Sequence, residues 1–164
     1  MRMERLYDPP LMPHLLVEGL NRFNDEPCLF LGDKVASYRE VRESTSQMVQ
    51  ALQAKGLGRG SRVAVISANR PEVLANIAAM QLAGCVGTPL HRQAAVVYLP
   101  FLLKAAGIYA LLCVASVFDE HAAQLKARVP GLQHLLGFGP TKTGEDYLAL
   151  AAGFAPQPLV APDV

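Results

Sequence analysis

Two glycine clusters are the first segments of this sequence to test for chemistry, because glycine-rich loops can hold phosphate. Such a loop leads into the N-terminus of a helix, whose free amides face the anion. The run from Gly56 to Gly60 has the opposite order, after an expected helix and before an expected strand. Gly139 and Gly144 have the separation of a Walker-type loop, but Glu145 stands where that loop needs lysine. We therefore expect neither cluster to bind a nucleotide.

His91 is the strongest single candidate for contact with a ligand. It follows Pro89 and Leu90 at the expected carboxyl end of a parallel strand, where open α/β sheets bind their ligands. Arg92, next to it, has the charge to hold a phosphate. The alternative is a solvated loop histidine, since many such loops only connect elements.

No catalytic residue and no metal site are predicted. The four histidines, at positions 14, 91, 121 and 134, share no metal-ligand spacing with each other or with a cysteine. No serine lies on a Gly-x-Ser-x-Gly turn, and adjacent carboxylates such as Asp119-Glu120 are typical of a solvated surface. The chain is expected to lack a catalytic constellation of its own.

The elements that must position the candidates begin with a hairpin and a capped helix. Cys28–Leu31 and Lys34–Ser37 flank Gly-Asp, a pair that favours a two-residue hairpin turn. Ser37 and Glu40 have the spacing of a capping box, and Gly56 supplies the stop of the helix that follows.

Strand and helix patterns then alternate, as in a parallel sheet. Val63–Ser67 predicts a buried strand, followed by a helix capped by Asn69 and buried nearly all round. Cys85–Pro89 predicts the next strand, which completes a βαβ unit. A looser repeat follows, with a helix within 94–106 that Pro100 kinks or begins, a strand at 109–114, a helix from a Ser116 cap to 128, a strand at 133–137 and a short helix at 145–152.

The predicted fold is therefore α/β, with a mainly parallel sheet flanked by helices and an N-terminal β-hairpin. Residues 1–27 are expected to be an approach segment with a short helix from His14 to Phe23. Residues 28–139 are expected to form the α/β subdomain. Residues 140–164, rich in proline, glycine and alanine, are expected to be a linker-like tail.

Composition excludes several classes of protein. Of the 164 residues, 51% are apolar and 18% charged, which is not the composition of a disordered chain. A net charge of +1 provides no broad field for nucleic acid, and no apolar run approaches the roughly 20 residues of a membrane span. Three widely spaced cysteines are typical of reduced thiols, so a cytoplasmic location is predicted.

The order of the motifs between residues 28 and 139 resembles the opening region of acyl-CoA synthetases and other adenylate-forming enzymes. These motifs are the Gly-Asp-Lys hairpin, Ser-Tyr-Arg-Glu-Val from Ser37, Gly-Leu-Gly-Arg-Gly-Ser-Arg-Val-Ala from Gly56, Asn-Arg-Pro-Glu from Asn69, and Ala-Gly at position 83 with Pro-Leu at 89. The sequence departs from the family at Ser61, usually Asp, at His91, usually Asn, and at Pro100, which falls in a helix that is normally uninterrupted.

The resemblance implies an N-terminal fragment of a fatty-acid–CoA ligase, the first subdomain of that enzyme's large N-terminal domain. Such enzymes use ATP and Mg²⁺ to adenylate a carboxylate and then transfer the acyl group to CoA. The family's phosphate loop and catalytic lysine are not among these residues. The fragment is therefore expected to be inactive and to bind no cofactor. Its expected partner is the remainder of the parent enzyme, and an exposed apolar face could also lead to self-association.

Two alternatives remain open. The chain could belong to another adenylating enzyme, such as a fatty acyl-AMP ligase or an aryl-CoA ligase. It could also be a stand-alone binding or assembly module that keeps the same fold.

Overall fold

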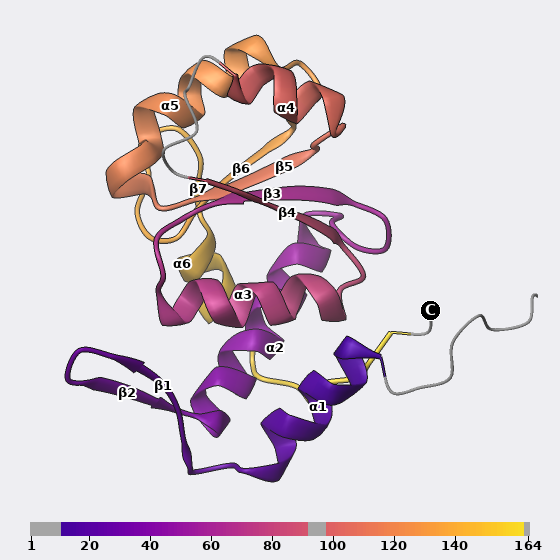
Figure 1. Cartoon of the computed structure of the whole chain (residues 1–164), viewed down its shortest axis with the longest axis vertical. Coiled ribbons are helices and arrows are strands. Elements are labelled where there is room, and N and C mark those ends of the chain that lie inside the picture. Colours follow the sequence, from indigo (N-terminus) through magenta and orange to yellow (C-terminus); the bar gives the residue numbers. More distant parts are fainter. Residues whose placement is uncertain (1–10, 92–97, 163–164) are drawn as a thin grey trace, which may run out of the picture.

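The computed structural model describes residues 11–91 and 98–162, and only the backbone for residues 115–121 (Figure 1). Its helices and strands alternate as the sequence predicts. In chain order the elements are α1 (Met12–Arg22), β1 (Pro27–Leu31), β2 (Lys34–Ser37), α2 (Tyr38–Ala54), β3 (Arg62–Ile66), α3 (Pro71–Leu82), β4 (Val86–Leu90), α4 (Leu99–Ala105), β5 (Ala110–Cys113), α5 (Ala115–Arg128), β6 (His134–Gly137), β7 (Glu145–Asp146) and α6 (Tyr147–Ala152).

A five-stranded parallel sheet with the order β4-β3-β5-β6-β7 forms the centre of the molecule. Helices α2, α3 and α6 lie on one side of this sheet, and α4 and α5 lie on the other (Figure 1). This arrangement confirms the predicted α/β class with a mainly parallel sheet. No helix in the described part of the chain is long and apolar enough to cross a membrane.

The central strands are apolar throughout because both faces of the sheet are covered. Residues Val63–Ile66 of β3 and Ala110–Cys113 of β5 are all buried, and the two strands pair with Ala64 opposite Leu111. The continuous apolar run of β3 therefore predicted its position correctly.

The hairpin and the capped helix are also confirmed. β1 and β2 pair antiparallel as a separate two-stranded sheet, which projects from the lower left of the view (Figure 1). The hydroxyl of Ser37 accepts a hydrogen bond from the Glu40 amide at 3.3 Å, and the Glu40 carboxylate accepts one from the Ser37 amide at 2.7 Å. These reciprocal bonds are the predicted capping box. The Ser37 amide and the Ser37 hydroxyl both donate to the Glu40 carboxylate and so lower its pKa.

Three predicted helix starts need correction. Arg70, not Asn69, is the N-cap of α3 and makes no side-chain capping bond, because Pro71 is the first helical residue and keeps the preceding residue extended. α5 begins at Ala115 with Val114 as its N-cap, so Ser116 lies inside the helix.

The first helix, α1, begins at Met12 rather than His14, with Pro13 in its first turn. Pro100 lies in the first turn of α4, the second of the two roles considered for it.

The C-terminal residues expected to be linker-like are part of the packed structure. β7 joins the sheet beside β6, and Tyr147 at the start of α6 is fully buried with its hydroxyl donating to the Met48 carbonyl at 3.1 Å. The expected boundary at residue 139 therefore does not coincide with the end of packing. The short helix expected at 145–152 is confirmed as α6, whereas the two residues of β7 are too few for a hydrophobic period to reveal them.

Candidate functional site

The carboxyl ends of β3 and β4 lie side by side at one corner of the sheet. Leu90, the last residue of β4, pairs with Ile66, the last residue of β3. His91 follows directly and is exposed, so the structure places this candidate at the sheet edge where it was predicted. Arg92, the second candidate, lies outside the described residues.

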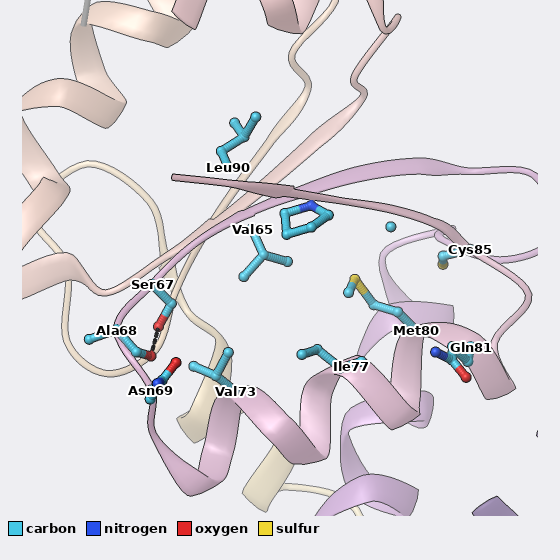
Figure 2. Close-up of a pocket in the computed structure, with 12 residues that line it drawn as sticks. Val65, Ser67, Ala68, Asn69, Val73, Ile77, Met80, Gln81, Cys85 and Leu90 are labelled. Atoms are coloured by element: carbon cyan, nitrogen blue, oxygen red, sulfur yellow. Dashed lines mark hydrogen bonds between the residues drawn. The ribbon is translucent and has the colours of Figure 1, made fainter. Parts of the chain in front are cut away.

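An apolar cleft of about 390 Å³ opens between α3 and β4 (Figure 2). Most of its lining is hydrophobic, and the polar residues lie towards its two ends, with Ser67 and Asn69 at one and Gln81 at the other (Figure 2). The apolar lining residues are Val65, Val73, Ile77, Met80, Pro89 and Leu90.

Sequence reasoning missed this cleft because α3 was expected to be buried nearly all round. Leu74 and Ile77 of α3 are 48% and 41% exposed, so one side of the helix is open to solvent. The low polarity of α3 was the sequence signal for the cleft. Apolar residues on an exposed helix face indicate a surface that another segment or molecule covers.

The ionisable group in the cleft is not poised for nucleophilic chemistry. Burial raises the pKa of Cys85 to about 11. The thiolate is the reactive form of cysteine, and nucleophilic cysteines have a lowered pKa. Cys85 is therefore a structural thiol.

The N-terminus of α3, at the end of the cleft, is a poor phosphate site. Pro71 has no amide hydrogen, and the Arg70 guanidinium bonds Glu72 in the first turn at 3.1 Å. The Glu72 carboxylate would repel an anion at the helix end that otherwise attracts one. Among the described side chains, which do not include those of residues 115–121, no group of three or more is suited to a metal ion. The start of α3 therefore does not fit the phosphates of ATP.

Comparison with known proteins decides the family. The sequence model of the family described as AMP-binding enzyme matches residues 16–161. The chain belongs to the AMP-binding enzyme family. The predicted resemblance to adenylate-forming enzymes is thus confirmed.

Its relatives include proteins with different named activities. The chain is 38% identical to the medium/long-chain-fatty-acid–CoA ligase FadD8 of Mycobacterium tuberculosis over 98% of its own length and 29% of that protein. Among solved structures, the amide bond synthetase McbA of Marinactinospora thermotolerans has a TM-score of 0.76 at 26% identity, covering 92% of this chain and 29% of McbA. A benzoate CoA ligase of Burkholderia xenovorans has a TM-score of 0.76 at 13% identity, covering 93% and 30%, a likeness of fold alone.

The chain spans less than a third of each of these proteins. It therefore corresponds to one portion of an AMP-binding enzyme, and its parallel sheet is part of their common architecture.

Proposed function

We propose that this chain is the N-terminal scaffold of a fatty-acid–CoA ligase. The observation that carries the proposal is the 38% identity to a medium/long-chain-fatty-acid–CoA ligase along 98% of the chain. The complete enzyme would adenylate a fatty acid with ATP and then transfer the acyl group to CoA. The enzyme would work in the cytoplasm, in keeping with Cys28, Cys85 and Cys113, which form no disulfide.

The role of this portion is to support residues that the rest of the ligase supplies. Charge develops on the transferring phosphate, and its stabilisation requires preorganised donors and a metal ion. The start of α3 supplies neither, since it carries Pro71 and Glu72. His91 and Arg92 remain the proposed ligand contacts, because His91 lies at the carboxyl edge of the sheet and Arg92 follows it.

The alternative is a different adenylating enzyme, such as a fatty acyl-AMP ligase or an aryl-CoA ligase. The benzoate CoA ligase has this fold, so the fold does not discriminate between acids. A stand-alone assembly module is a further possibility, and it predicts no ligase activity in any longer product of the gene.

Assay of the complete gene product tests the proposal. We expect pyrophosphate release and acyl-CoA formation with medium- and long-chain fatty acids, followed by mass spectrometry. Turnover with benzoate alone would favour the aryl-CoA alternative, and acyl-adenylate that never becomes acyl-CoA would favour the fatty acyl-AMP ligase. No turnover with any acid would favour the stand-alone assembly module over every ligase hypothesis.

The 164-residue chain alone is expected to show no ATP binding by calorimetry, even at millimolar nucleotide. The physical reason is the carboxylate and the missing amide at the one helix start that faces the cleft. The expected control is the complete gene product, which binds ATP under the same conditions. Stoichiometric binding by the short chain would show that the site is misplaced.

A further inference from the structure

Residues 153–160 follow α6 without helical or strand structure and pass along α2. Most of this segment is exposed, but Leu159 is only 8% exposed and belongs to the hydrophobic core. We call residues 153–160 the strap. An extended, exposed segment keeps one path only if specific contacts hold its backbone.

Three side chains of α2 supply those contacts. Gln47 Nε2 donates to the Phe154 carbonyl at 2.8 Å, and Gln50 Nε2 donates to the Ala155 carbonyl at 2.8 Å. The Ser46 hydroxyl accepts a hydrogen bond from the Gln157 amide at 2.7 Å. Ser46 is only 3% exposed, and loss of its hydroxyl would leave the Gln157 amide without its acceptor.

The spacing of these side chains explains how one helix holds an extended segment. Ser46 and Gln50 are four residues apart, and Gln47 and Gln50 are three apart, so all three lie on neighbouring positions of the helix surface. They bond to the main chain of the strap, so they fix its path without reading its side chains.

The strap connects the two edges of the parallel sheet. Before it, the Lys55–Glu145 ion pair and the buried Tyr147 hold β7 and α6 against α2. After it, Pro162 lines a second cavity, of about 370 Å³, together with Gly84 and Cys85 at the start of β4. The sheet order places β7 and β4 at opposite edges, so the strap returns the chain from one edge to the other.

We propose that Ser46, Gln47 and Gln50 are positioning residues that clamp the strap and so set where the chain passes the amino end of β4. If the proposed function holds, the same clamp fixes the point from which the next segment of the ligase leaves this scaffold. The clamp itself rests only on the three hydrogen bonds and does not depend on which acid is activated.

Hydrogen exchange of the 164-residue chain tests the clamp. In the double variant Gln47→Glu, Gln50→Glu, each side chain keeps its shape but loses the donor and places a negative charge at a carbonyl. We expect the Gln157 amide, which donates to Ser46 while the strap lies along α2, to exchange at least tenfold faster, while peptides from β3 and β5 keep their rates. The double variant Gln47→Ala, Gln50→Ala is expected to do the same without added charge.

The matched control is Gln124→Ala, which changes an exposed glutamine of α5 and should leave the strap unaffected. Unchanged exchange of the Gln157 amide in both double variants would overturn the clamp. Equal acceleration in the strap and in β3 would also overturn it, because the glutamines would then stabilise the whole fold rather than this segment.

A second readout in the complete ligase separates the clamp from the proposed function. We expect the alanine double variant to lower kcat by about fivefold or more, while KM for ATP and for fatty acid stays within twofold. The reason is that the binding residues are unchanged and only their positions shift. Absence of ligase activity in the wild-type enzyme would defeat the proposed function and leave the exchange result standing. Wild-type kcat in a variant with a loosened strap would defeat the positioning role.

Discussion

Cys85 and Tyr147 are two acids that the fold keeps in their neutral forms. Burial raises the pKa of Cys85 to about 11, and it raises the pKa of Tyr147 well above its usual value. The Tyr147 hydroxyl donates to the Met48 carbonyl, a role that only the protonated phenol can fill. At neutral pH both groups therefore contribute to packing and carry no charge.

Cys85 is expected to react slowly with iodoacetamide at pH 8. The thiolate fraction of Cys85 is roughly 300-fold lower than that of a free cysteine with a pKa of about 8.5. A more basic thiolate is more nucleophilic, which raises the alkylation rate by about tenfold. The net expectation is alkylation about 30-fold slower than that of glutathione, measured by mass spectrometry of the peptide that carries Cys85. Labelling at the rate of a free thiol would contradict the burial of this side chain.

Alkaline pH is expected to destabilise the fold through the same groups. Burial raises the folded-state pKa of Cys85 above its ordinary value to about 11, so its contribution to stability is complete below the ordinary pKa and is lost as the pH rises towards 11. Urea unfolding should show a lower free energy of unfolding at pH 11 than at pH 9. Cys85→Ala should reduce this loss by about 1 kcal/mol, a value that allows for solvent screening of a partly exposed thiol. An identical pH profile in the variant would rule out this role for Cys85.

At the scale of elements, α2 organises more of the structure than its length suggests. It packs against α1, α3 and α6, carries the clamp on the strap, and begins at the capping box that joins it to the hairpin. Unfolding of the first turn of α2 would therefore destabilise the hairpin as well as the helix.

Ser37→Ala is expected to lower the free energy of unfolding by about 1 kcal/mol, because the Glu40 amide loses its acceptor and the reciprocal bond loses its geometry. Urea denaturation measures the change. Ser44→Ala, in the interior of the same helix, is the control and should change stability by less than about 0.5 kcal/mol. Equal effects of the two substitutions would mean that the capping box contributes nothing specific.

Elements with a strong local cause were predictable from the sequence, and elements set by distant contacts were not. The structures of the capping box at Ser37 and of β3 are each determined by a few neighbouring residues. β7 and the strap form because they meet β6 and α2 across the fold, which no local pattern encodes. For the candidate site, the carboxyl-edge rule placed His91, while the cleft depends on which face of α3 is left open.

At the scale of the whole molecule, the two edges of the parallel sheet differ in character. β7 is only two residues long and carries Glu145, paired with Lys55, and short charged edges resist further pairing. β4 has five residues, and within the described chain no strand pairs with its outer side. Val86 at its start is 51% exposed, and Gly87, Pro89 and Leu90 of the same strand line the apolar cleft.

This asymmetry predicts that the 164-residue chain self-associates through the β4 edge as its concentration rises. Exposed apolar surface next to an unpaired strand favours association with another copy when nothing else covers it. Light scattering should show an average mass above that of a monomer, and Val86→Lys should return it towards the monomer by placing a charge on the edge. Leu15→Lys, which adds the same charge to a half-exposed leucine of α1, is the matched control and should leave association unchanged. A monomeric wild-type chain at every concentration, or equal effects of the two lysines, would show that the β4 edge does not drive association.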